Sequence, residues 1–154
     1  MYREFGGADG LMDAALEHYA STVLEPNAAQ IDPAAPLREV LTAMVEMFTD
    51  PDRAGPAGCL LARMQHAPTQ LGPTVAARVI ALRDGARQRY AELIELAKER
   101  GEIPPDVPTD VAAAMIDIQC NALLMRMATE EDPAVLRAQA LLAFDSLTDR
   151  TRSA

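Results

Sequence analysis

Residues 109–128 form the most apolar segment of the chain, and their hydrophobic side chains recur at helical spacing on two sides. One stripe consists of Val111, Met115, Ile118, Ala122 and Met125. The opposite stripe consists of Ala112, Ile116, Cys120, Leu123 and Met127. A helix that packs on a single core needs only one apolar stripe, so the second stripe is expected to face a partner subunit or a ligand. The alternative is a central helix that is buried on all sides, which is common in all-helical domains.

Five further segments show the periodicity of amphipathic helices. They are residues 8–24, 37–49, 59–66, 73–100 and 133–148. Pro26 and Asn27 are expected to end the first helix. Gly101 is expected to stop the long helix, and Thr109 to act as the N-cap of the apolar helix that follows. The sequence therefore predicts one all-α domain of six helices, long enough at 154 residues to bury a sizeable core.

Gly85 lies inside the long predicted helix, where a glycine costs about 1 kcal/mol relative to alanine. Two explanations are open. A neighbouring element packs closely against this position, or Gly85 is a tolerated surface residue.

The charge of the chain argues against nucleic-acid binding. The net charge is −9, from 23 acidic and 14 basic residues, which opposes contact with a phosphate backbone. No apolar run approaches the roughly 20 residues of a membrane span, and the first residues lack a secretion signal, so a cytoplasmic location is expected. Cys59 and Cys120 lie in apolar segments, as buried thiols do in a reducing compartment; a redox pair is the alternative.

Catalytic patterns are scarce. No glutamate has a histidine three residues later, as a di-iron helical bundle requires, and no Gly-x-Ser-x-Gly or phosphate-binding glycine loop is present. His18 and His66 have no metal-ligand spacing with the cysteines, so no metal or cofactor is expected. His66 is open to two interpretations: a donor to a bound ligand, or a helix-end histidine favoured by the macrodipole.

Several motifs resemble TetR-type transcriptional regulators. Residues 2–11, Tyr-Arg-Glu-Phe-Gly-Gly-Ala-Asp-Gly-Leu, look like the end of that family's DNA-binding module, where a recognition helix ends in Tyr-x-x-Phe and turns at glycine. Gly58-Cys59-Leu60-Leu61, the connector at 101–106 and the two closing helices resemble the family's regulatory domain. The chain departs from the family where Ala8 replaces a common lysine and Asn121 a common glycine. The family's segment upstream of Tyr2 has no counterpart in this sequence, and either a late start assignment or a truncated form is expected to account for it.

The resemblance implies a division of the chain into three parts. Residues 1–7 correspond to a remnant of the recognition helix and its turn, with Tyr2 as the remaining DNA-contact position. Residues 8–148 correspond to the ligand-binding and dimerisation domain, and residues 149–154 to a flexible tail. DNA is a partner only where the N-terminal module is present.

The resemblance also implies a homodimer. In the family the last two helices pair with their copies as a four-helix bundle, and the second apolar stripe of residues 109–128 suits such a helix. The candidate interface residues are Ile116, Cys120, Leu123, Met127, Leu136, Ala140 and Phe144. Which of the two stripes faces the partner is not decided by the sequence.

A small-molecule pocket is expected between the helices of 37–49, 59–66, 75–97 and 109–127. The candidate lining residues are Met44, Phe48, Cys59, Met64, Tyr90, Met115 and Gln119, with Tyr90 and Gln119 as polar anchors. The alternative is a solid core of the same composition. The resemblance thus implies the effector-sensing domain of a TetR-like repressor that binds a small apolar or aromatic ligand. A helical interaction module without a small-molecule site is the main alternative, and an enzyme is a weaker one.

Overall fold

The computed structural model describes residues 6–50, 52, 58–129 and 131–148, and this part of the chain is all-helical. The helical elements are α1 (Ala8–Tyr19), the π-helical segment η1 (Ala20–Leu24), α2 (Glu25–Ala29), α3 (Leu37–Thr49), α4 (Leu60–Gln65), the 3-10 turn η2 (Pro68–Gln70), α5 (Pro73–Glu99), α6 (Thr109–Met127) and α7 (Pro133–Thr148). Because α1, η1 and α2 are continuous, the described chain forms the six helices that the sequence predicts. Tyr2 and residues 149–154 lie outside the described residues.

The first helix continues past Pro26, so the prediction that it ends there is wrong. Proline has no N–H, and in an α-helix its ring collides with the carbonyl group four residues earlier. Directly before Pro26 the helix widens into η1, where the Glu25 N–H donates to the Ala20 carbonyl five residues back. The wider turn admits the proline, and the helix then continues to Ala29.

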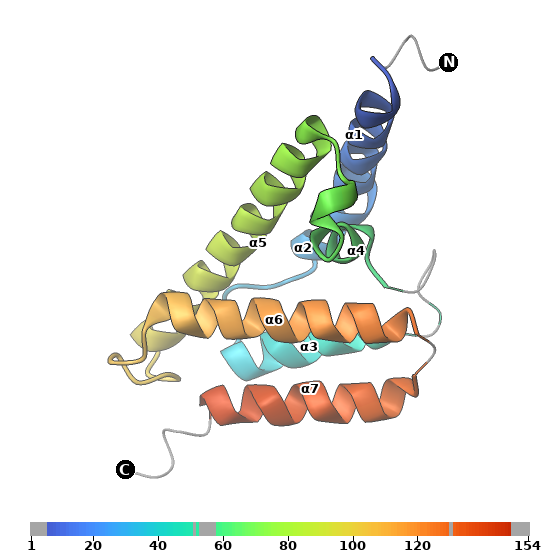
Figure 1. The fold of residues 1–154 in the computed structure, drawn as a ribbon. Helices are drawn as coiled ribbons and strands as arrows, with labels where there is room; N and C mark the ends of the chain where they lie inside the picture. The colour runs from blue at the N-terminus through green and yellow to red at the C-terminus, as the bar shows by residue number, and fades with distance from the viewer. Residues whose placement is uncertain (1–5, 51, 53–57, 130, 149–154) are drawn as a thin grey trace.

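Helices α3, α6 and α7 form one layer of the domain. Helices α6 and α7 lie side by side and antiparallel, and α3 packs against both (Figure 1). Helix α5 leaves this layer at an angle, and its C-terminal part packs on α6 (Figure 1). The most deeply buried side chains of the core in this layer include Leu37, Leu41, Met44, Val45, Ile94, Ala97, Ile103 and Ile116.

A second core lies between α1, α4 and the N-terminal part of α5. Its buried members are Leu16, Cys59, Leu61, Ala62, Met64, Val75, Val79 and Leu124. Polar contacts also hold α1 to α5: the Asp9 carboxylate accepts the N–H groups of Thr74 at 3.0 Å and Val75 at 3.2 Å. The N-cap residue of α5 is Gly72, which has no side chain, so Asp9 on α1 caps the first turn of α5 instead. The hydrogen bonds from Thr74 lower the pKa of Asp9.

The prediction for the end of α5 is confirmed, whereas the prediction for the start of α6 is wrong. Gly101 stops α5 as predicted, with φ at +74° and the Glu102 N–H donating to the Ala97 carbonyl at 2.8 Å. Thr109 does not cap α6, because Pro108 occupies the N-cap position. The Thr109 hydroxyl instead accepts a hydrogen bond from Lys98 at 2.6 Å and donates one to Glu95. Both partners lie on α5, so the hydroxyl that was predicted to cap α6 links α6 to α5.

Among the described helices, none is both long enough and apolar enough to cross a membrane.

Candidate ligand-binding site

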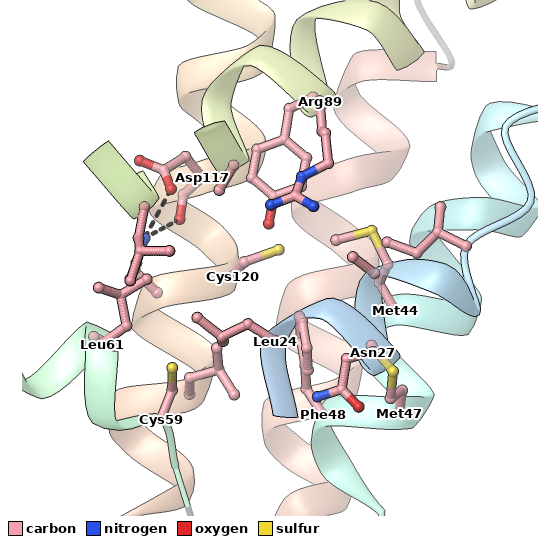
Figure 2. A pocket seen from close by; sticks show the side chains of 18 of the residues that line it. Leu24, Asn27, Met44, Met47, Phe48, Cys59, Leu61, Arg89, Asp117 and Cys120 are labelled. Carbon is pink, nitrogen blue, oxygen red and sulfur yellow. Dashed lines mark hydrogen bonds between the residues drawn. The ribbon is translucent and has the colours of Figure 1, made fainter. Parts of the chain in front are cut away.

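A cavity of about 550 Å³ lies where the two cores meet. Its walls come from the end of the first helix, α3, α4, α5 and α6, and Phe48 packs against both cores beside it (Figure 2). The apolar wall residues include Leu24, Ile31, Met44, Met47, Phe48, Leu61, Leu82, Leu93, Leu96 and Leu124. Sites for small molecules are typically 300–1,000 Å³, concave and mostly apolar, and this cavity falls within that range.

Four of the seven candidate lining residues meet at this cavity. They are Met44, Phe48, Cys59 and Tyr90. Met64 is instead buried in the core beneath α1, and Met115 borders a separate hollow of about 260 Å³ near the end of α7. Gln119 is half-buried and lies on the side of α6 that faces away from the cavity.

Helical geometry explains why Met115 and Gln119 lie elsewhere. The cavity side of α6 carries Asp117, Cys120, Asn121 and Leu124. At about 100° per residue, position 119 is rotated by roughly 200° from position 117, so it points to the opposite side. Asp117 and Asn121 therefore supply the polar groups that the sequence assigned to Gln119.

Asp117 is the charged residue at the polar end of the cavity, which we define as Tyr90, Asp117, Cys120 and Asn121. The Asp117 carboxylate accepts from Arg87 Nε at 2.9 Å and from the Asn121 amide at 2.9 Å. The same amide donates to the Asp117 carbonyl oxygen at 2.9 Å (Figure 2). A buried carboxylate with these partners is compensated inside the protein, as burial of a charge requires.

Each of the two cysteines in the cavity wall lies beside a tyrosine. Tyr19 donates a hydrogen bond to Cys59 at 3.3 Å, and Tyr90 neighbours Cys120. Burial raises the pKa of the Cys120 thiol to about 12, and the Asp117 charge adds to this shift. Burial also raises the pKa of Tyr90 well above its usual value. Both groups are therefore neutral at pH 7, and the Cys120 thiol is a poor nucleophile.

Sequence reasoning missed several wall residues, above all Asp117, Asn121 and Arg89. The signal for the first two was present: a polar pair four residues apart on a helix that is otherwise apolar. His66, for which a ligand contact was one interpretation, is exposed, and its ring nitrogen pairs with the Ala62 carbonyl oxygen at 2.8 Å.

The candidate dimer residues are mostly covered by the chain itself. Six of them are buried in the protomer core: Ile116, Cys120, Leu123, Leu136, Ala140 and Phe144. Met127 is half-buried against the same core, and Cys120 also borders the cavity. This stripe of α6 packs on the core of the same chain, whereas Val111 and Ile118 of the opposite stripe are exposed.

Comparison with known proteins identifies the fold. Residues 33–142 match the family described as the tetracyclin repressor-like C-terminal domain. The chain belongs to the TetR family. No curated protein matches it.

Two solved structures share the TetR fold. One is a double cysteine mutant of the TetR family transcriptional regulator CifR in complex with operator DNA, with 22% identity, a TM-score of 0.73, and coverage of 94% of this chain and 77% of that one. The other is a putative TetR transcriptional regulator from Rhodococcus sp. RHA1, with 23% identity, a TM-score of 0.63, and coverage of 96% and 79%. The family and both structural neighbours are regulators rather than enzymes.

Proposed function

We propose that this TetR-family chain is an effector-sensing and dimerisation domain and that a small apolar effector occupies the cavity between the two cores. The observation that carries the proposal is the cavity itself, about 550 Å³ in volume and largely apolar in its walls. The cavity is partly open to solvent, and its size and largely apolar walls are those of a small-molecule site.

A thermal-shift screen with apolar and aromatic compounds tests the effector site. A compound that binds the native state raises the unfolding temperature, since ligand at about 100 times its Kd adds roughly 2.7 kcal/mol of stability. Ala86 is half-buried on α5 and borders the cavity, so Ala86→Phe places a ring in the space. Ala81 is exposed on the same helix and does not border it, so Ala81→Phe is the matched control.

We expect compounds to stabilise the wild type and Ala81→Phe but not Ala86→Phe. If no compound raises the unfolding temperature of the wild type, or if Ala86→Phe responds as the wild type does, the cavity is not an effector site.

We further propose that the outward faces of α6 and α7 pair with those of a second copy. Of the six large hydrophobic side chains that are exposed in the described part of the chain, four lie on these two helices. They are Val111, Ile118, Val135 and Leu142, and Leu142 is 73% exposed. An obligate interface buries on the order of 2,000 Å² or more, and a face of two adjacent antiparallel helices is suited to such an area.

Sedimentation at micromolar concentration tests the dimer. We expect twice the chain mass of 16.6 kDa for the wild type. Leu142→Glu should shift the protein to the monomer, because a charge would be buried at the interface. Ile80→Glu is the control, since Ile80 is 50% exposed on α5, away from the proposed interface. A wild-type monomer, or equal effects of the two substitutions, would contradict this assignment.

A further inference from the structure

We infer that the effector is an apolar carboxylic acid whose carboxylate is bound by Arg89 while its hydrophobic part lies along Leu24, Met44 and Phe48. This inference rests on the proposed function, because it takes the cavity between the two cores to be the effector site. It adds the chemical class of the ligand and its orientation in the cavity.

The arginines on α5 differ in their pairing. Three of the four form an ion pair with an aspartate: Arg78 with Asp13, Arg83 with Asp84 and Arg87 with Asp117. Arg89 forms no ion pair with any residue that the structure describes. It is also the only cation among the described residues of the cavity wall.

The Arg89 side chain forms part of the cavity wall, although it is exposed to solvent. Its guanidinium group is drawn above Cys120 in Figure 2. A guanidinium carries five N–H donors in a planar fork that fits both oxygens of a carboxylate. Arg89 is exposed, so water screens such a pair in part, and the apolar walls beside it shield the pair on the cavity side. A ligand that holds its carboxylate at Arg89 then has Leu24, Met44 and Phe48 for its hydrophobic part.

The acidic residues at the cavity leave Arg89 available to an anion. Asp117 is already compensated by Arg87 and Asn121, so it requires no cation from a ligand. Glu25 and Glu92 also border the cavity, and both are exposed to solvent, which screens their charges. They weaken the attraction of an anion to Arg89 without neutralising the guanidinium through a direct contact.

A matched series of three compounds tests the charge preference. 4-Butylbenzoate, 4-butylbenzyl alcohol and 4-butylbenzylamine share one hydrophobic skeleton and are anionic, neutral and cationic at pH 7. Binding to the 154-residue chain is measured by calorimetry at low ionic strength. We expect the benzoate to bind about tenfold more tightly than the alcohol, and the amine to bind most weakly.

Variants then assign the preference to Arg89. Arg89→Met should lower the affinity for the benzoate by about tenfold and that for the alcohol by much less, since a neutral hydroxyl loses only an uncharged hydrogen bond. Arg83→Met is the matched control, because Arg83 lies on the same helix but not in the cavity wall, and it should change neither affinity. Glu92→Gln should strengthen benzoate binding severalfold, a gain that general damage to the fold would not produce.

The outcomes separate this inference from the proposed function. If compounds of the thermal-shift screen bind while the benzoate does not, the cavity is still an effector site but its ligand is not a carboxylic acid. The same conclusion follows if the amine binds more tightly than the benzoate. The same holds if the preference for the benzoate survives Arg89→Met. If neither the screen nor the three compounds show binding, the effector site itself is wrong, and this inference falls with it.

Discussion

The Asp117 carboxylate on α6 is held by Arg87 on α5 at 2.9 Å, although the two side chains differ greatly in exposure, 8% for Asp117 and 46% for Arg87. The pair joins the two helices that form one wall of the cavity, and water reaches only one of its members. The energetic effect of the contact therefore depends on which partner is removed. Loss of Arg87 leaves a buried carboxylate with one partner fewer, whereas loss of Asp117 leaves a guanidinium that water can still reach.

We expect Arg87→Met to reduce the free energy of unfolding by about 1–3 kcal/mol, because the Asp117 carboxylate keeps only the Asn121 amide. Arg83→Met is the control, since its ion pair with Asp84 is solvent-exposed and such pairs contribute about 0–1 kcal/mol. Urea titration of both variants measures the difference. Equal losses would show that the Arg87–Asp117 contact does not stabilise the junction of α5 and α6.

Gly58 and Gly85 should respond to alanine in opposite directions. Gly58 has φ at +90°, and a Cβ there would lie 2.9 Å from both the Ala128 Cβ and the Leu124 carbonyl oxygen. Gly58→Ala should therefore cost about 1–3 kcal/mol. Gly85 lies in a helix, and a Cβ at this position would meet nothing within 4 Å, so Gly85→Ala should stabilise the protein by about 0.5–1 kcal/mol. Thermal unfolding of the two variants checks both signs, and a stabilising Gly58→Ala would contradict the close approach of α4 and α6.

The positions of the helices were predictable because apolar periodicity and breakers act locally. The predicted segments 37–49 and 133–148 coincide with α3 and α7. The end of the first helix was not predictable in the same way, since the effect of Pro26 depends on the wider turn before it. For Gly85, the structure favours the tolerated surface residue over the close packing of a neighbour.

The orientation of α6 could not be read from the sequence, because its two stripes are similarly apolar. Ile116 is fully buried and Ile118 is 59% exposed, yet both are isoleucines two positions apart. Which of the two isoleucines is buried depends on where α5 crosses α6 and how α7 packs on it. These contacts join residues far apart in the sequence. The same limit applies to the cavity: Tyr90 was identified as a polar anchor, but its neighbour Cys120 was assigned to the interface.

The chain of 154 residues is expected not to bind DNA by itself. Its net charge of −9 repels a phosphate backbone, and non-specific binding depends on cationic contacts that release counterions. Electrophoretic mobility shifts on random duplex at low salt, where such binding is strongest, provide the measurement. A shift that weakens steeply with added salt would contradict the expectation.

The Tyr90–Cys120 pair predicts a loss of stability at alkaline pH. Burial raises the pKa of Cys120 from 9.0 to about 12, and raises that of Tyr90 as well. Above pH 9 the unfolded chain therefore releases protons that the folded chain keeps, so stability falls as the pH rises toward 12. Each group contributes a loss of up to about 1.4 kcal/mol per pH unit within its own range.

Urea titrations from pH 7 to 11 measure this dependence, with Cys120→Ala as the comparison. The variant loses the thiol and leaves a small void, so it should be less stable at pH 7. Its stability should nevertheless fall less steeply above pH 9 than that of the wild type, because one of the two titrating groups is gone. Cys59→Ala controls for removal of a buried thiol in the same cavity wall, and the comparison rests on the slope rather than the stability at pH 7. Parallel slopes for the wild type and Cys120→Ala would show that the Cys120 thiol titrates in the folded protein as it does in the unfolded chain.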